Sequence, residues 1–399
     1  MADSGRKLPS PSARAKPLAA RRKLKMARSL GTYIRGSTTS FYQWLVHPAA
    51  AIPAGPPVWI CGDCHIGNFG PIASSDGEIK IQIRDFDQAT IGNPAFDLIR
   101  LGLSLAADAA TSDLSGVTTA RMLEHLQQSY AAGLTQPGRS PAKADDPKLL
   151  RKLLRVAENR SWKKLCKERF DGAQRSIPLG SRFWPISQRE RDEIGRLVAS
   201  DEMSSLVTCL RGRDNKTKLT LLDAAYWVKG CSSLGRLRYA VLLAVQDKSG
   251  KPDYCLIDIK EAVRPKAPAH RRAGFPKHDG QRVVLAARRL SPSVGQRMQP
   301  GRILGRAVFI RELRPQDIQP EIPRLAKDEV LKLAAFLAGV LARAHADQMN
   351  ASTRREWKRK LTGRRRSKGR SASWLWENVV ELMARHERAY LEHCRDVPL

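Results

Sequence analysis

The side chains best suited to chemistry lie in two short acidic segments. Asp63 and Asn68 follow an apolar run and have four residues between them, and Asp85 and Asp87 flank Phe86 further along. Carboxylate and carboxamide oxygens are the ligands that a hard cation such as Mg²⁺ prefers. We therefore expect Asn68, Asp85 and Asp87 to bind Mg²⁺, which leaves Asp63 as a candidate general base.

A short strand and a hairpin are expected to position these residues. The apolar run Val58–Ile60 predicts a strand that leads into the first acidic segment. After Asn68 come a strand-like run, a turn over residues 74–77 and isoleucines at alternate positions from 79 to 83. Because the two arms of a hairpin lie side by side, the ends that carry Asn68 and Asp85 are expected to meet.

The first segment also contains Cys61, Cys64 and His65, which form the C-x-x-C-H pattern of covalent haem attachment. Haem attachment requires export, and the N-terminal sequence lacks the apolar part of a signal peptide, so no haem is expected. A zinc site would need a second pair of ligands at suitable spacing. A dithiol redox pair would give Asn68 and the second acidic segment no role.

A second informative segment lies between residues 223 and 262. It predicts a strand, a Gly- and Ser-rich turn, a strand, a turn and a third strand that ends at Lys260. The first turn contains Gly230, Ser232, Ser233 and Gly235. Backbone N–H groups of such a turn can lie over phosphates, and Lys260 could reach the α- and β-phosphates of a nucleotide below it. Taken alone, this pattern is more typical of an ordinary β-meander.

Phosphoryl transfer uses more of these residues than the other chemistries do. It requires a base, metal ligands for the β- and γ-phosphates, and a cation with backbone donors for the triphosphate. The spacing of Asp63 and Asn68 equals that of the kinase catalytic loop, in which Asp is the base and Asn binds metal. Asp85-Phe86-Asp87 follows a hairpin, as the kinase D-F-G does. The expected cofactors are therefore ATP and Mg²⁺.

Several motifs make a family resemblance specific. They are G-D-C-H-I-G-N-F-G, I-R-D-F-D-Q-A, N-P-A-F-D-L-I-R, K-M-A-R-S-L-G-T-Y-I-R-G, V-K-G-C-S-S-L-G, I-D-I-K-E-A and L-A-R-A-H-A. Through them the chain resembles the uncharacterised bacterial family called domain of unknown function 2252, over most of residues 22–350. That family is itself similar to aminoglycoside phosphotransferase-like and choline kinase-like proteins, whose loop reads G-D-x-H-x-x-N.

The resemblance implies an α+β, two-lobed fold of the protein kinase-like type. The roles it implies are Asp63 as the base, Asn68 and Asp85 as Mg²⁺ ligands, His65 and Asp97 as supports of the loop, and Lys260 on the α- and β-phosphates. Two features depart from the pattern. Ser232 replaces the middle glycine of G-x-G-x-x-G, and residues 281–290, where a glutamate should pair with the lysine, contain no acidic residue.

The order of these parts predicts a circular permutation. In kinases the Gly-rich loop and its lysine precede the catalytic loop, whereas here they follow it. Chain termini that lie close together at a surface permit such a rearrangement. We expect a disordered basic lead-in (1–20), the catalytic-loop part of the helical lobe (21–134), a linker with a helical insertion (135–200), a β-rich nucleotide-binding lobe (201–320) and the C-terminal helices of the helical lobe (321–399).

The chain is strongly basic. Its 399 residues include 70 Lys and Arg against 39 Asp and Glu, a formal net charge of +31. This charge favours polyanionic partners, and a solvated basic surface explains it equally well. Residues 354–370 are a dense basic run of this kind. Seven scattered Cys, no signal peptide and no apolar run long enough to span a membrane predict a cytoplasmic protein.

Three functions follow from these features. The first is an ATP- and Mg²⁺-dependent phosphotransferase that acts on a hydroxyl group, with a small-molecule acceptor favoured over a protein. The second is an inactive kinase-like module that binds nucleic acid or an acidic partner through its basic surface. The third is transfer of AMP rather than phosphate.

Overall fold

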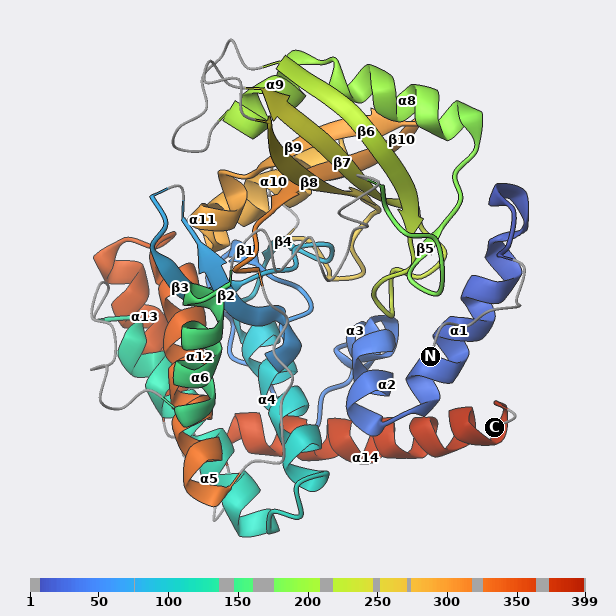
Figure 1. Cartoon of the computed structure of the whole chain (residues 1–399). Coiled ribbons are helices and arrows are strands. Elements are labelled where there is room, and N and C mark those ends of the chain that lie inside the picture. The colour runs from blue at the N-terminus through green and yellow to red at the C-terminus, as the bar shows by residue number, and fades with distance from the viewer. Residues whose placement is uncertain are drawn as a thin grey trace.

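The protein is a mixed α+β structure with a six-stranded antiparallel sheet, as a computed structural model shows (Figure 1). The structure describes residues 8–74, 76–135, 147–160, 176–208, 218–246, 252–270, 274–317, 326–363 and 373–397. Within these ranges, no helix combines the length and the apolar character needed to cross a membrane. The predicted α+β class is confirmed.

The six-stranded sheet has the order β5-β6-β7-β8-β10-β9, and every neighbouring pair is antiparallel. Its strands are β5 (Phe183–Trp184), β6 (Lys218–Trp227), β7 (Arg238–Gln246), β8 (Pro252–Glu261), β9 (Met298–Ile303) and β10 (Arg306–Leu313). Helices α8 (Gln188–Val198), α9 (Asp201–Thr208) and α10 (Asp279–Leu290) pack on it, and the short α11 (Pro292–Gly295) packs on α10 and on the hairpin described below. Within the segment expected to be a linker with a helical insertion (135–200), β5 thus pairs with the sheet and α8 packs on it.

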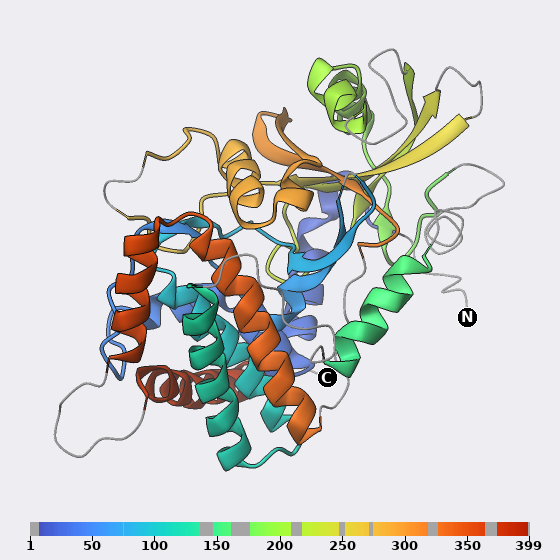
Figure 2. The ribbon, with the colours of Figure 1, turned by 90° about the vertical axis from the view of Figure 1, so that its left-hand side faces the viewer.

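A helical part lies below this sheet in Figure 1. Its helices are α4 (Ala95–Ala110), α5 (Gly116–Gly133), α6 (Lys148–Glu158), α12 (Lys327–Ala346), α13 (Ala351–Thr362) and α14 (Trp374–Arg395). Helix α12 packs along α5, and α14 packs against α4 (Figure 2). Leu98, Leu101 and Leu105 of α4 are all fully buried, and their helical spacing places them on one packing face.

The predicted hairpin lies between the sheet and the helices (Figures 1 and 2). It consists of β2 (Phe69–Ala73) and β3 (Ile79–Ile83), in a register that pairs the first residue of β2 with the last of β3. Gly77 closes the turn with a positive φ of 91°, which glycine adopts without steric cost. A second pair, β1 (Val58–Ile60) with β4 (Thr90–Gly92), holds the two flanks of the hairpin together.

Residues 11–13 and 15–20 are helical, although they fall in the segment expected to be a disordered lead-in, and residues 1–7 of that segment lie outside the described ranges. After the 3₁₀ turn η1 (Pro11–Ala13) come α1 (Ala15–Ala27), α2 (Leu30–Gly36) and α3 (Thr38–Trp44). Arg14 is buried, and its guanidinium donates to Glu190 of α8 at 2.7 Å. The apolar side chain of Leu18 is buried as well. This ion pair and this packing offset the conformational entropy that the segment loses on folding, and composition alone does not reveal such contacts. The other end of α1 contacts α14.

Candidate active site

Lys260 of the sheet meets the acidic pair that follows the hairpin. Its Nζ lies 2.6 Å from Oδ2 of Asp87 and 3.4 Å from Oδ2 of Asp85. The lysine side chain is only 6% exposed, whereas that of Asp85 is 43% exposed. The cluster is therefore closed on the lysine side and open to solvent at one carboxylate. These residues come from the two segments that the sequence singled out independently.

The three charges shift one another's pKa. Burial and the neighbouring Asp85 carboxylate raise the pKa of Asp87 to about 6. Burial also disfavours the charged form of Asp85, but the Lys260 ammonium outweighs it and holds the pKa of that carboxyl below its usual range. The pKa of Lys260 is raised, because the two carboxylates overcome the effect of burial. At neutral pH this cluster therefore contains one cation between two carboxylates.

The register of the sheet fixes the lysine. Lys260 pairs with Arg238 of β7 on one side and with Phe309 of β10 on the other. Arg238 is held in turn by a hydrogen-bonded ion pair with Asp258, with Nε 2.9 Å from Oδ1. Glu261 does not pair with Lys260 and instead accepts hydrogen bonds from the backbone of Leu237 and from an arginine of β10. Lys260 is thus held in place from both neighbouring strands.

Helix α10 provides no carboxylate for the lysine, as its sequence indicated. Its acidic residue, Asp279, pairs with Arg282 at 3.0 Å. The same arginine donates to the backbone carbonyl of Asp87 at 3.0 Å and also to that of Ala89. Arg282 therefore holds the backbone that carries the acidic pair, a role that sequence reasoning missed.

Asp97 organises the loop that contains Asp63. The Asp97 carboxylate is fully buried and accepts from the backbone N–H groups of Cys61 at 2.6 Å and Gly62 at 2.9 Å. Its Oδ2 also lies 3.4 Å from Nε2 of His345. Gly62 has a φ of 75°, and a Cβ at this position would lie 2.0 Å from the carbonyl oxygen of residue 88. The chain therefore turns sharply here, and a buried carboxylate fixes the turn.

The Asp63 side chain is 13% exposed, and both of its oxygens accept hydrogen bonds. Nε of Arg100 lies 2.9 Å from Oδ1, and Oγ1 of Thr38 lies 3.1 Å from Oδ2. Arg100 is fully buried and donates as well to the carbonyl of Ile34 at 2.7 Å. Asn68, at the end of the 3₁₀ turn η2 (Ile66–Asn68), donates from Nδ2 to the backbone carbonyl of Asp63 at 2.8 Å. The Oδ1 atom of Asn68 is then the one that could accept a hydrogen bond or bind a metal ion.

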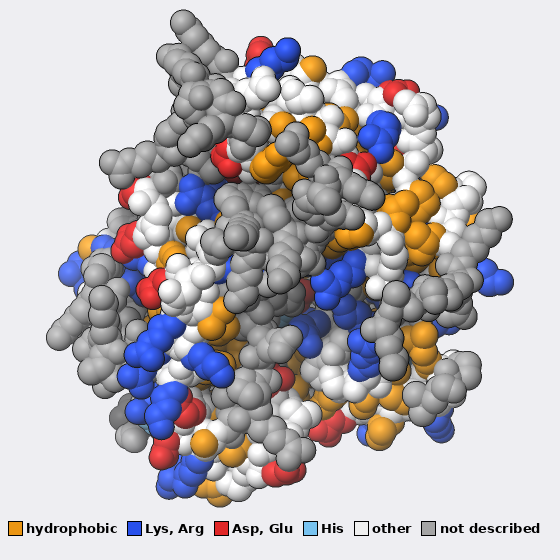
Figure 3. All heavy atoms as spheres, viewed as in Figure 1, with side chains coloured by type: hydrophobic (Ala, Val, Ile, Leu, Met, Phe, Trp, Pro, Cys, Tyr) orange, Lys and Arg blue, Asp and Glu red, His pale blue; other side chains and the backbone are white. Residues whose placement is uncertain are grey.

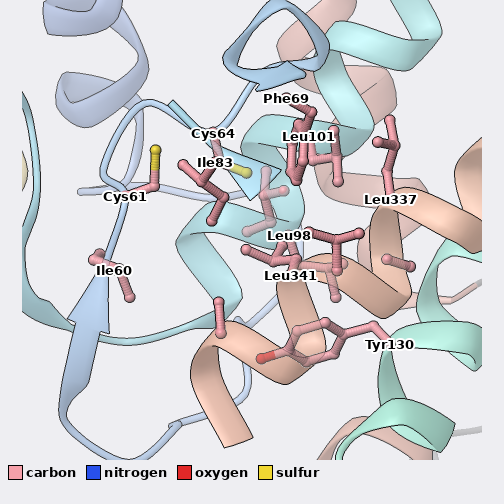
Figure 4. Close-up of a cluster of buried hydrophobic side chains, with 14 of the residues drawn as sticks. Ile60, Cys61, Cys64, Phe69, Ile83, Leu98, Leu101, Tyr130, Leu337 and Leu341 are labelled. Carbon is pink, nitrogen blue, oxygen red and sulfur yellow. The ribbon is translucent and has the colours of Figure 1, made fainter. Parts of the chain in front are cut away.

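His65, Cys61 and Cys64 are buried around the same loop. Burial lowers the pKa of His65 to about 4, so the imidazole is neutral at physiological pH. Burial raises the pKa of the Cys64 thiol, and Cys61 also has a raised pKa. Figure 4 shows both cysteines among apolar core side chains. The two thiols therefore behave as small core residues.

The Gly- and Ser-rich turn joins β6 to β7 and adopts the backbone that its glycines permit. Gly230 and Gly235 have φ of 96° and 97°. The turn is close to the charged cluster, since the guanidinium of Arg236 lies 4.0 Å from Asp87. Nζ of Lys25 on α1 donates to the Gly230 carbonyl at 2.8 Å. Ser233 is buried, and Ser232 is partly exposed.

The acidic cluster contains donors of the type that Mg²⁺ prefers. Asp87 Oδ1 is buried and has no hydrogen-bond partner among the described residues. Together with Asp85 and Asn68 it offers carboxylate and carboxamide oxygens. No group of three or more His, Cys, Asp or Glu side chains in the described ranges is arranged as a metal site. In this arrangement the cation held by both carboxylates is the ammonium of Lys260.

Two of the residues around Asp63 could have been found in the sequence. Arg100 lies three positions after Asp97, so both are on one face of α4. Thr38 lies at the start of α3, two residues after Gly36, the last residue of α2. No pattern in the sequence singles out Lys25 or Arg282 as a residue of the site, because the chain contains many Lys and Arg residues.

The fold and the site together define a class: a mixed α+β protein with a buried lysine and acidic cluster at the junction of a sheet and a helical part. Residues 14–396 match the family described as "Uncharacterized protein conserved in bacteria (DUF2252)", and the chain belongs to this family. No curated protein matches the chain, and no solved structure does.

Proposed function

We propose that the protein is an ATP- and Mg²⁺-dependent phosphotransferase with a circularly permuted, kinase-like arrangement of its two lobes. The observation that carries this proposal is the contact of Lys260 with Asp85 and Asp87. A kinase site requires a lysine on a strand and an acidic metal-binding segment to face one another. Here these two parts are far apart in the sequence and still meet.

The nucleotide would lie between the turn of Gly230 to Gly235 and the acidic cluster. The raised pKa of Lys260 keeps it cationic, so it can exchange a carboxylate for the α- and β-phosphates. Asn68 and Asp85 would hold Mg²⁺, with Asp87 beside them. The metal would neutralise charge on the β- and γ-phosphates. The 43% exposure of the Asp85 side chain leaves this carboxylate open to such a ligand.

Asp63 would orient the acceptor hydroxyl. The hydroxyl oxygen forms a bond to the γ-phosphorus, the bond between that phosphorus and the bridging oxygen breaks, and ADP leaves. The hydroxyl proton passes to the Asp63 carboxylate. The ion pair with Arg100 holds this carboxylate in place. A positioned carboxylate suffices, because the loose transition state of phosphoryl transfer depends mainly on positioning and charge.

Transfer of label from ATP to a pool of small hydroxyl compounds tests this proposal. ATP labelled in the γ-phosphate should pass label to an acceptor, whereas ATP labelled in the α-phosphate should not. Label arriving from the α-phosphate instead would establish AMP transfer. Asp63→Asn should abolish transfer, and the matched control Asp347→Asn, at an exposed position after α12, should not. Transfer by Asp63→Asn at the wild-type rate would contradict the assignment of the base.

A second candidate is an inactive module that binds nucleic acid or an acidic protein through its basic surface. The observation in its favour is that Asp63 is already bonded at both oxygens and that Lys260 is already paired. For such a module, affinity should fall steeply with added salt. Substitution of Asp63 should then leave binding unchanged.

A further inference from the structure

Three cations from α1 and α2 lie together beside the catalytic loop. They are Arg22, Lys25 and Arg35, and each is partly buried. None of them forms an ion pair with a carboxylate among the residues that the structure describes. Figure 3 shows Lys and Arg side chains gathered on this face between the sheet and helices α1 to α3. The carboxyl of Asp108 acts electrostatically on Arg35, but the three partly buried cations outnumber it and so favour an anionic ligand.

The hydrogen bonds of the three cations leave donors unused. Arg22 donates from Nη2 to the Gly36 carbonyl at 3.3 Å, and Lys25 donates to the Gly230 carbonyl. Arg35 donates from Nε to the Gly31 carbonyl and from Nη2 to the Thr32 hydroxyl. All of these acceptors are neutral. A guanidinium has five N–H donors and an ammonium has three, so most of the donor capacity is available to an oxyanion.

Cys231 shows that these cations share one locality. Burial raises the pKa of its thiol, and Lys25, Arg22 and Arg35 all act electrostatically in the opposite direction. Burial and the cations Arg28 and Arg35 in turn lower the pKa of Lys25, against a favourable effect of the Cys231 thiol. Arg28 and Arg35 thus disfavour the charged form of Lys25, and a bound anion would relieve that repulsion.

The position of Arg35 relates this cluster to the acceptor side of the site. A Cβ on Gly67 would lie 3.2 Å from Nη1 of Arg35 and 3.2 Å from Nδ1 of His65. Gly67 belongs to the loop between Asp63 and Asn68, so the guanidinium lies against the loop of the proposed base. Nδ1 of His65 is buried and has no hydrogen-bond partner among the described residues. Lys260, in contrast, faces Asp85 and Asp87.

We infer that Arg22, Lys25 and Arg35 form a binding site for a phosphomonoester group, and that the acceptor of phosphoryl transfer is a small hydroxyl compound that already has one phosphate. This inference rests on the proposed function. Three cations match a dianion, and the guanidinium of Arg35 can donate two parallel N–H bonds to phosphate oxygens. A cationic acceptor such as an amino sugar or choline would be repelled.

Calorimetric titration with glycerol 3-phosphate, in low salt and without nucleotide, tests the inference directly. We expect wild-type protein to bind it and to bind choline not at all. Arg35→Gln and Lys25→Gln should each weaken binding at least about tenfold, because each removes a charge-assisted contact. Lys23→Gln is the matched control, since Lys23 lies exposed on the same helix outside the cluster. Equal binding by wild type and Arg35→Gln would overturn the inference, as would binding of choline instead.

A parallel titration with Mg-ADP separates this inference from the proposed function. If Arg35→Gln weakens Mg-ADP as much as glycerol 3-phosphate, the cluster belongs to the nucleotide site and the inference is wrong. If Lys260→Met abolishes Mg-ADP binding while glycerol 3-phosphate binds nowhere, the proposed function stands and only the acceptor class fails. If glycerol 3-phosphate binds through Arg35 while Mg-ADP does not bind, the anion site stands without the kinase assignment.

Discussion

The contact between Asp63 and Arg100 gives a quantitative prediction. Nε of Arg100 lies 2.9 Å from the carboxylate, and the exposed fractions of the two side chains are 13% for Asp63 and 0% for Arg100. Removing one partner of a buried ion pair leaves the other charge uncompensated and costs about 3–5 kcal/mol. Arg100→Met also loses the bond to the Ile34 carbonyl, so we expect this variant to be destabilised by about 4 kcal/mol. Asp63→Asn retains a hydrogen-bond acceptor and should lose about 2–4 kcal/mol.

The double variant shows whether the two residues act as a pair. Asp63→Asn combined with Arg100→Met leaves no isolated charge, so its loss should be smaller than the sum of the single losses by about 1–3 kcal/mol. Urea denaturation at neutral pH measures the free energies of unfolding. Losses that add to within about 0.5 kcal/mol would refute the reasoning, because they would show that the ion pair contributes no coupling energy. The Mg-ATP affinity of Asp63→Asn should equal that of wild type, since Lys260 and Asp85 are retained.

Three further predictions concern the supports of the site. Asp97→Asn should lower the free energy of unfolding by about 2–4 kcal/mol in urea denaturation, because an amide cannot accept from both Cys61 and Gly62; an unchanged value would remove Asp97 as a support. Gly62→Ala should lower the free energy of unfolding by at least about 2 kcal/mol, whereas Gly77→Ala, with a similar φ but open space around it, should lower it by about 1 kcal/mol. Equal losses would contradict the close contact between Gly62 and the carbonyl oxygen of residue 88. Burial raises the pKa of Asp108 to about 6, against the opposing effect of Arg35, so the folded state keeps this carboxyl protonated between pH 4 and 6 and the free energy of unfolding falls as pH rises through that window. Asp108→Asn should raise the free energy of unfolding by up to about 3 kcal/mol at pH 7 and leave it unchanged below pH 4. An increase at both pH values would refute the burial argument.

Periodicity predicted the elements whose apolar residues repeat regularly. The alternation of isoleucines predicted the β2–β3 hairpin. Periodicity did not predict the helix α1 in the basic segment before residue 21, because this helix is held by the contacts of Arg14 and Leu18 with residues far along the chain. A single sequence contains no local signal for such contacts.

The site was predictable as two groups of residues and not as one arrangement. The residue types singled out the two carboxylates and the lysine that the structure brings together, and Asp97 accepts a hydrogen bond from the loop, as expected of a support. The contact of Lys260 with the acidic pair depends on tertiary folding, and so do the bonds of Arg282 to the backbone of residues 87 and 89. The basic run over 354–370 is described only to residue 363, where it forms the end of α13.

The central claim is that Lys260 and the acidic pair form one nucleotide site, and calorimetric titration with Mg-ATP tests it most directly. Wild-type protein should bind, and Lys260→Met should bind at least about tenfold more weakly, because a buried charge-assisted contact to phosphate is lost. Lys332→Met, at an exposed position of α12, should bind like wild type. No binding by wild-type protein, or equal binding by Lys260→Met, would contradict the account.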